Sequence, residues 1–276
     1  MPITIPTVTL NNGVEIPQLG FGVFQVPDAE TTAAVTTALQ VGYRSIDTAA
    51  VYGNEAGTGR ALAESELERS ELFITTKLWN AEQGYDTTLA AFDASLAKLG
   101  LEYLDMYLIH WPSPARDSYL ETWRAFEKLY ADGRVRAIGV SNFLPEHLQR
   151  IIDAGGTVPA VNQIEVHPAL QQRSIQDFNH EHGIRTEAWS PLAKGTVLAD
   201  PIITSIAARA DRTPAQVVLR WHLQQDRIVI PKSVTPARIA ENLDAMSFEL
   251  TDDELARIDS LESDGRTGPD PATFNR

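Results

Sequence analysis

The chain has 276 residues, 43% of them hydrophobic, and a formal net charge of −14. This length and composition suit a globular protein with a large core, and α/β barrels of about 250 residues fold as one domain. Such an acidic chain is not drawn as a whole to phosphate backbones or anionic lipid, so neither nucleic acid nor a membrane is an expected partner. Any anion that it binds must be held by a local cluster of cations.

Cysteine is absent, which excludes disulfides and thiolate chemistry. No run approaches the ~18 apolar residues that a membrane span needs. The first ten residues, MPITIPTVTL, lack the basic stretch and apolar core of a secretory signal. We therefore expect a cytoplasmic protein.

The first predicted element is a hairpin, because two short alternating runs flank Asn12-Gly13 in TVTLNNGVEIP. Strand-like and helix-like runs then alternate down the chain. Most of the strand-like runs are nearly continuous apolar stretches, which is typical of parallel strands buried on both faces. The eight candidate strands are GFGVF (20–24), YRSIDTA (43–49), LFITTKL (72–78), YLDMYLIHW (103–111), VRAIGVSN (135–142), AVNQIEV (160–166), IRTEAWS (184–190) and IVIPKS (228–233).

The segments between these strands carry helix signals. Apolar residues recur at helical spacing from Leu89 to Leu99, and Gly100 marks the end of that helix. Thr213-Pro214 and Thr235-Pro236 each place a capping residue before a proline at the first helical position. Further glycines stand where helices should end, namely Gly133, Gly155 and Gly183.

Eight alternating strand–helix units without a linker predict a closed (β/α)8 TIM barrel that occupies residues 1–276 as a single domain. Two helical stretches, 201–210 and 251–263, exceed the eightfold count and are interpreted as insertions. An open doubly wound sheet is the alternative. It would be favoured by a Gly-x-Gly-x-x-Gly turn after the first strand, and neither 20–22 (GFG) nor 57–59 (GTG) completes that pattern.

Polar side chains gather at the carboxyl ends of three consecutive strands, where a barrel carries its active site. Asp47 and Tyr52 follow the second strand, Lys77 lies in the third, and His110 ends the fourth. Each has an ordinary reading when taken alone. Asp47 could cap a helix, Tyr52 could be packing, Lys77 could reach solvent at a strand end, and His110 could be a core histidine.

Together these four residues make a coherent acid catalyst. A tyrosine keeps its proton at neutral pH, and a neighbouring ammonium lowers its pKa by stabilising the phenolate. The aspartate holds the lysine in place, and the histidine can hydrogen-bond a substrate oxygen. Such a site donates a proton to an oxygen that is becoming an alkoxide. The sequence offers no nucleophile and no metal cage there, so a hydride must come from elsewhere.

At this point several motifs, in order along most of the chain, resemble the aldo-keto reductase superfamily. They are SIDTAAVYGNE, FITTKLW, LIHWP, GVSN, NQIEVHP, WSPLAKG and IPKSVTPARIAENL. Among its members the chain is most similar to the short-tailed prokaryotic branch typified by 2,5-diketo-D-gluconate reductases. The resemblance implies an NADP(H)-dependent oxidoreductase acting on CH–OH groups, a catalytic tetrad of Asp47, Tyr52, Lys77 and His110 with Tyr52 as proton donor, and a monomer.

The resemblance also implies that NADPH lies extended across the barrel mouth. Ser141, Asn142 and Gln163 match the clamp for the nicotinamide carboxamide, and Trp189 matches the aromatic ring on which the nicotinamide stacks. Taken alone, Gln163 and Trp189 would be barrel packing. The remaining expected cofactor contacts are Ser190, Leu192 and Gly195 over the pyrophosphate, Lys232, Ser233, Val234 and Arg238 at the 2′-phosphate end, and Glu241 and Asn242 at the adenine.

The residues themselves point to the same phosphate end. The region after the eighth strand and the first turn of the next helix carry Lys232, Ser233 and Arg238. Phosphate groups often bind after the last strands of a barrel and at helix N-termini. Two cations in a chain of charge −14 indicate a specific anion, which favours NADPH over NADH. The alternative is that Arg238 is a surface arginine paired with Glu241 or Glu254.

The resemblance indicates reduction of aldehydes and ketones, because relatives that reduce carbon–carbon double bonds carry glutamate at the position of His110. The expected substrate pocket is walled by Phe24, Trp79 and Trp111, with His110 among the contacts and Phe21 a further candidate. Such a wall accepts many small carbonyls; keto sugars or keto acids, such as 2,5-diketo-D-gluconate, and α-dicarbonyls are plausible from the resemblance alone. In the family the C-terminal tail, 264–276, can fold over the mouth, which would bring Phe274 to the substrate.

Two rival functions come from other classes. A regulatory protein could bind NADPH on the same barrel without catalysis, but it would have no need to keep Tyr52 and Lys77 together. A barrel hydrolase would want paired carboxylates or a histidine-rich metal centre at the strand ends, and the sequence has neither. The run 180–182 (HEH) could suggest a metal, but residues i and i+2 diverge on a helix, so we expect no metal there.

Overall fold

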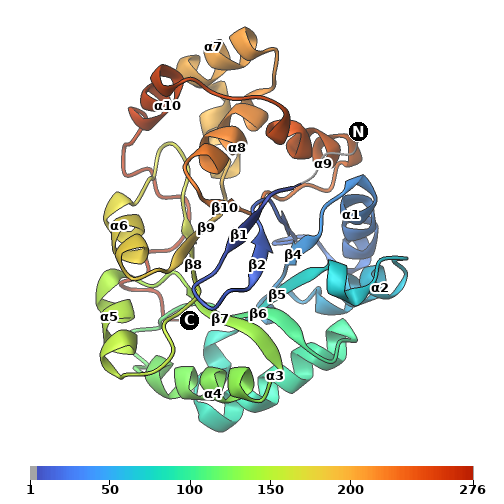
Figure 1. The fold of residues 1–276 in the computed structure, drawn as a ribbon, viewed down its shortest axis with the longest axis vertical. Helices are drawn as coiled ribbons and strands as arrows, with labels where there is room; N and C mark the ends of the chain where they lie inside the picture. Colours follow the sequence, from blue (N-terminus) through green and yellow to red (C-terminus); the bar gives the residue numbers. More distant parts are fainter. Residues whose placement is uncertain (1–4, 276) are drawn as a thin grey trace.

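The computed structural model describes residues 5–275, and it begins with the predicted hairpin. Strands β1 (Thr7–Thr9) and β2 (Glu15–Pro17) pair antiparallel across a turn in which Gly13 adopts a left-handed conformation, with φ of +82°. In Figure 1 the hairpin lies across one opening of the barrel. Its apolar side chains Leu10 and Ile16 pack with the strand residues Met106 and Leu108, so the hairpin closes the floor of the barrel.

Eight parallel strands follow within the described residues, one in each segment where the sequence predicts a strand. They are β3 (Phe21–Gly22), β4 (Ser45–Asp47), β5 (Phe73–Leu78), β6 (Leu104–Ile109), β7 (Val135–Ser141), β8 (Val161–Glu165), β9 (Arg185–Trp189) and β10 (Ile228–Val229). Each pairs with the next along the chain, in the order β3 to β10. The first and last are much shorter than the apolar runs that predicted them, because those runs continue into the loops at the barrel mouth.

The sheet closes on itself between its first and last strands. Leu19 bridges Val229 in parallel register, and the amide of Gly20 donates to the Val229 carbonyl over 2.8 Å. Closure requires a glycine at position 22, since a Cβ there would stand 2.9 Å from the carbonyl oxygen of Ile230. The predicted (β/α)8 barrel is therefore confirmed, and the open doubly wound sheet is wrong.

Helices surround the barrel in Figure 1. They are α1 (Asp28–Val41), α2 (Glu55–Ala63), α3 (Tyr85–Leu99), α4 (Tyr119–Ala131), α5 (Pro145–Asp153), α6 (Arg173–Glu181), α7 (Pro201–Ala210), α8 (Pro214–Gln224), α9 (Pro236–Leu243) and α10 (Asp252–Asp259). As predicted, α7 and α10 are additions to the eightfold pattern. None of the helices within residues 5–275 combines the length and apolar character that crossing a membrane requires.

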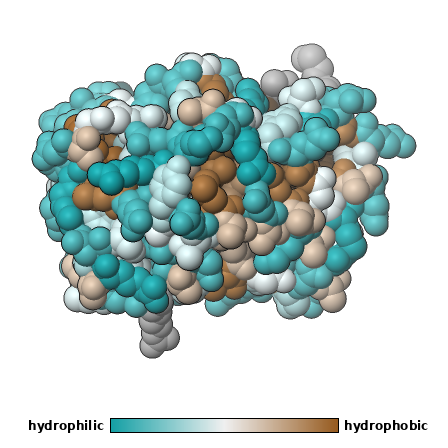
Figure 2. Space-filling model, turned by 90° about the horizontal axis from the view of Figure 1, so that it is seen from below, coloured by the Kyte–Doolittle hydropathy of each residue, from teal (hydrophilic) through white to brown (hydrophobic). Residues whose placement is uncertain are grey.

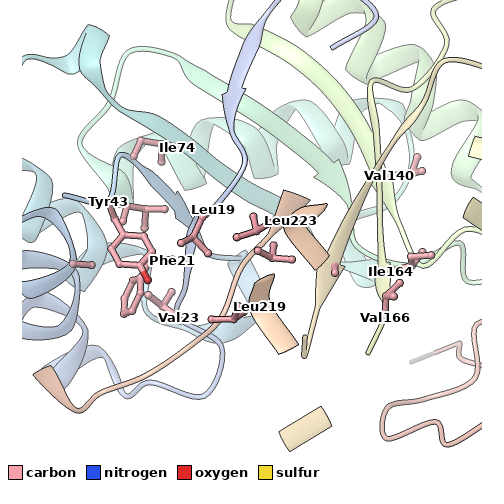
Figure 3. Close-up of a cluster of buried hydrophobic side chains, with 14 of the residues drawn as sticks. Leu19, Phe21, Val23, Tyr43, Ile74, Val140, Ile164, Val166, Leu219 and Leu223 are labelled. Atoms are coloured by element: carbon pink, nitrogen blue, oxygen red, sulfur yellow. The ribbon is translucent and has the colours of Figure 1, made fainter. Parts of the chain in front are cut away.

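The largest core lies between the strands and the helices. Figure 3 shows part of it, where Leu19, Phe21 and Val23 gather near Tyr43. The rings of Phe21 and Tyr43 meet edge to face at 5.7 Å. Phe21 therefore belongs to this core rather than to the substrate pocket for which it was a candidate. Figure 2 shows one outer side of the molecule, where hydrophilic side chains cover much of the surface around smaller apolar areas.

Asp105, at the start of β6, ties three segments of the lower barrel together. Its fully buried carboxylate pairs with Arg69 at 2.6 Å and with Arg136 at 2.8 Å, and it accepts the backbone amide of Ile74 at 2.9 Å. A buried carboxylate needs such partners to offset the loss of its hydration. Removing it takes the carboxylate partner away from both guanidinium groups.

Asp105→Ala should lower the free energy of unfolding by about 2–3 kcal/mol, a value reduced from the range for buried pairs because both arginines are partly exposed. Urea denaturation followed by circular dichroism measures the loss. The matched control is Asp93→Ala, which removes an exposed partner of Arg134 and should cost less than about 1 kcal/mol. Equal losses in the two variants would contradict a structural role specific to Asp105.

Candidate active site

The four catalytic candidates meet at the carboxyl ends of β4, β5 and β6. Asp47 ends β4, Tyr52 closes the short 3₁₀ turn that follows it, Lys77 lies in β5, and His110 follows β6. The Lys77 ammonium donates to Asp47 Oδ1 over 2.5 Å and to the Thr48 carbonyl over 2.9 Å. It also lies 5.2 Å from the centre of the Tyr52 ring, and the His110 ring meets the Tyr52 ring at 5.6 Å.

Burial sets the protonation of the tyrosine and the lysine. It raises the pKa of the Tyr52 hydroxyl above its usual value, and the charge and hydrogen bonding of Lys77 oppose this rise without cancelling it. Burial lowers the pKa of Lys77, but the charge and hydrogen bonding of Asp47, together with the charges of Tyr52 and Glu187, outweigh that effect and leave the pKa raised. At neutral pH the site therefore holds a protonated phenol beside a charged ammonium.

His110 is neutral at neutral pH. Burial, together with the positive charge of Lys77, holds its pKa well below the usual range for histidine. Its Nδ1 is buried and has no hydrogen-bond partner among the described residues. The His110 ring also meets Trp79 edge to face at 5.4 Å, which restricts its rotation. A neutral imidazole held in this way offers one hydrogen bond to an oxygen in front of Tyr52.

A cleft of about 1210 Å³ runs from this cluster across the barrel mouth, a volume at the upper end of ligand sites. Asp47, Tyr52 and His110 line one part of it, whereas Lys77 lies fully buried beneath them. Twelve of the thirteen predicted cofactor residues also line the cleft: Ser141, Asn142, Gln163, Trp189, Ser190, Leu192, Gly195, Lys232, Ser233, Arg238, Glu241 and Asn242. The exception is Val234, whose side chain is 46% exposed and outside the cleft lining.

Polar groups of β7, β8 and β9 form a linked set on the cleft wall. Ser141 Oγ donates to the Gln163 carbonyl over 2.9 Å, and Asn142 Nδ2 donates to the His110 carbonyl over 3.0 Å. The indole N–H of Trp189 donates to Asn142 Oδ1 over 2.8 Å, which fixes the plane of the tryptophan ring. Asn142 adopts a left-handed backbone with φ of +64°, a conformation that asparagine tolerates better than most residues.

The loop after β9 is held from below by a buried pair. Arg227 Nε donates to His222 Nδ1 over 3.0 Å, so the other ring nitrogen of His222 carries the proton and donates to the Pro191 carbonyl over 3.2 Å. Within the loop, Ser190 and Gly195 both have positive φ, and the backbone turns sharply there. Both residues line the cleft.

The far end of the cleft carries the two cations predicted there. Lys232 and Arg238 are exposed, and Arg238 lies in the first turn of α9. Within the described chain, Glu254 pairs with Arg209, and Glu241 accepts the hydroxyl of Thr213 over 2.7 Å. The surface pairing of Arg238 with either glutamate is therefore not the arrangement in this structure.

The predicted aromatic wall faces Tyr52 at the other end. Phe24 lies over Tyr52 with ring centres 4.9 Å apart, and Trp79 and Trp111 flank His110. The C-terminal tail completes this wall. Phe274 packs on Trp111 at 4.4 Å and on Trp79 at 6.4 Å, so the tail folds over the mouth.

One buried carboxylate anchors that tail. Glu165, at the end of β8, accepts the backbone amides of Thr267 and Gly268 at 2.8 and 3.0 Å and bonds to His167 at 3.2 Å. Burial raises the pKa of Glu165, but these hydrogen bonds outweigh it and leave the pKa lowered. Gly268 lies against Trp189 so closely that an added Cβ would stand 2.4 Å from the indole ring. The tail therefore packs directly against Trp189.

Sequence reasoning missed some residues of this site. Glu187, in the middle of β9, is buried beside the cluster, and an acidic residue inside a predicted buried strand was the available signal. No sequence pattern predicted that Thr267 and Gly268 would bind Glu165, because the composition of the tail does not predict where it packs. The run 180–182 ends α6, where His182 stacks on Phe178, and the described residues contain no cluster of His, Asp and Glu that could hold a metal ion.

Comparison with known proteins agrees with this geometry. The family model described as "Aldo/keto reductase family" matches residues 18–263. An aldo-keto reductase of Mycolicibacterium smegmatis is 57% identical over 270 residues, which cover 98% of each chain. The glyoxal reductase of Bacillus subtilis is 51% identical over 273 residues, again 98% of each.

A solved structure is similar over nearly the whole chain. It is the crystal structure of a Gox0644 mutant in complex with NADPH, which is 51% identical, has a TM-score of 0.95, and covers 98% of this chain and 99% of its own. The narrower likeness to 2,5-diketo-D-gluconate reductases stays a prediction. The chain belongs to the aldo/keto reductase family.

Proposed function

We propose that the protein is an oxidoreductase that uses NADPH to reduce small aldehydes and ketones to alcohols. One observation carries the proposal. Tyr52, Lys77, Asp47 and His110 converge at one end of a 1210 Å³ cleft, and Lys232 and Arg238 stand at its other end. Family membership, the glyoxal reductase relative and the NADPH bound in the similar structure support the same function.

The protein residues then act on the carbonyl oxygen. His110 donates a hydrogen bond that aims the oxygen at Tyr52, and Tyr52 donates its proton as negative charge develops there. Lys77 stabilises the phenolate that remains, and Asp47 keeps Lys77 in place. NADPH would supply the hydride when bound. Ser141, Asn142 and Gln163 would hold its nicotinamide carboxamide, and Trp189 would pack against the ring. Residues 190–195 would cover its pyrophosphate, with Glu241 and Asn242 near its adenine.

Tyr52→Phe removes the proton donor and should lower kcat/KM by about 10²–10⁴-fold, the usual contribution of a positioned acid. The affinity for NADPH, measured by quenching of tryptophan fluorescence, should stay within about threefold of wild type. The substitution removes only one hydroxyl, and a hydrogen bond lost with it would change the affinity by no more than about that amount. The assay is NADPH consumption with small aldehydes, ketones and keto sugars.

The matched control for this test is Tyr107→Phe, whose buried hydroxyl has no hydrogen-bond partner among the described residues and lies outside the cleft. It should retain wild-type turnover. A wild-type enzyme inert toward the whole panel, or a Tyr52→Phe variant as active as the control, would overturn the proposed mechanism. It would instead favour a protein that binds NADPH without catalysis.

The two cations at the far end are proposed to bind the 2′-phosphate of NADPH. Arg238 lies in the first turn of α9 and Lys232 in the segment before it, and a helix N-terminus favours anions. Replacing both by glutamine, as Lys232→Gln with Arg238→Gln, should lower the ratio of kcat/KM for NADPH to that for NADH by about tenfold or more, as charged hydrogen bonds are lost. Lys128→Gln on α4, an exposed lysine paired with Asp132, is the control. An unchanged ratio would rule out this assignment.

The tail is proposed to help hold the substrate, because Phe274 reaches the aromatic wall. Glu165→Gln keeps the size of the anchor but loses an acceptor for the tail amides, so we expect KM for carbonyl substrates to rise about tenfold. Amide hydrogen exchange at residues 266–270 should accelerate in parallel. Glu249→Gln, at an exposed carboxylate, is the control. Faster exchange without any change in KM would show that the tail does not help to bind the substrate, which would contradict this proposal.

A further inference from the structure

The centre of the barrel holds a second acidic side chain besides Asp47. Glu187 lies in the middle of β9, is 1% exposed, and pairs in register with Gln163 of β8. Family motifs and the mechanism above assign it no role. A carboxyl group buried this deeply is costly unless it is hydrogen-bonded or paired.

Gln163 stands between the two carboxylates. Its Nε2 donates to Asp47 Oδ2 over 2.9 Å and to Glu187 Oε2 over 2.9 Å. A side-chain amide has only two N–H groups, and ionised carboxylates can only accept. Both donors of Gln163 are therefore used. Turning the amide over would set its oxygen against the carboxylate of Asp47, which pairs with the Lys77 ammonium, so this orientation is fixed by chemistry.

The consequence lies on the cleft side of Gln163. Gln163 lines the cleft. Because Asp47 and Glu187 hold its NH₂ group, the amide oxygen is the polar atom of Gln163 that remains to face the cleft. An oxygen in that place accepts a hydrogen bond from a donor such as a primary carboxamide. Asp47 alone would hold one of the two N–H groups, and rotation about the side chain would remain open.

We propose that Glu187 is a positioning residue of this site: with Asp47 it locks Gln163 so that the amide oxygen receives the carboxamide of the nicotinamide. The inference rests on the proposed function. In this role Glu187 orients Gln163, which would hold the cofactor, and does not itself contact the reacting atoms.

The charge of Glu187 gives this role a second, separate readout. Burial and repulsion by Asp47 raise the pKa of Glu187 to about 7, while the hydrogen bond from Gln163 and the charge of Lys77 oppose the rise. In turn, negative charge on Glu187 raises the pKa of Tyr52. Removing that charge while keeping a hydrogen-bond acceptor therefore lowers the pKa of Tyr52.

Two substitutions separate position from charge. Glu187→Met keeps the length but loses the acceptor, so we expect the Kd for NADPH, measured by tryptophan fluorescence, to rise about tenfold. Glu187→Gln can turn its amide oxygen to Gln163, so its Kd should stay within about twofold of wild type. In alcohol oxidation Tyr52 accepts the proton. The pH profile of kcat for Glu187→Gln should therefore move about one pH unit lower, which is the effect expected of losing one nearby charge in a partly polar interior.

The matched control is another buried carboxylate beside β5, outside the barrel. Glu55 on α2 is 1% exposed and accepts the hydroxyl of Thr76 over 2.7 Å. Glu55→Gln should leave both the Kd and the pH profile unchanged. Should Glu187→Met not fold, Glu187→Leu repeats the binding measurement.

Equal affinities of Glu187→Met and Glu187→Gln for NADPH would overturn the positioning role. An unmoved pH profile in Glu187→Gln would overturn the influence of the charge on Tyr52. Both outcomes differ from failure of the proposed function, which would appear as a wild-type protein that reduces none of the carbonyls tested. The binding comparison would still be readable in that case.

Discussion

The buried ion pair between Lys77 and Asp47 is the constraint on which the rest of the site depends. Lys77 is fully buried, and an ammonium in that position is sustained only by close partners: Asp47 Oδ1 at 2.5 Å and the Thr48 carbonyl at 2.9 Å. These partners belong to the neighbouring strand β4 and the residue after it. Correct pairing of β4 with β5 therefore positions the Lys77 ammonium. Its positive charge in turn opposes the rise in the pKa of Tyr52 that burial causes.

Barrel closure supplies the rest of the geometry. Because β3 meets the segment around β10 through Gly20 and Gly22, the mouth becomes a continuous ring, and residues in or directly after all eight barrel strands face one cleft. In the proposed function, strands and their ends carry the groups that hold protons and orient the cofactor. Loops would carry the groups that select the substrate, as is usual where a scaffold supports variable chemistry.

Acidic groups recur at the points where this fold needs fixed positions. Asp105 gathers two arginines below the barrel, Glu165 anchors the tail, and Asp47 and Glu187 bracket Gln163. In each case a carboxylate organises donors that would otherwise move. The net charge of −14 thus coexists with a cation-bearing end of the cleft, and these four acids are committed to internal partners.

The sequence by itself determined the order of the elements, the hairpin, the two extra helices and the four residues that meet at the ends of β4, β5 and β6. These follow from local patterns, namely apolar runs, capping residues and polar residues at strand ends. Strand lengths were overestimated, since apolar runs also continue into packed loops. The place of Phe21, the fold of the tail onto Glu165, and the bracketing of Gln163 by Glu187 were decided only by the tertiary structure. Each depends on contacts between residues distant in the chain, which local pattern does not encode.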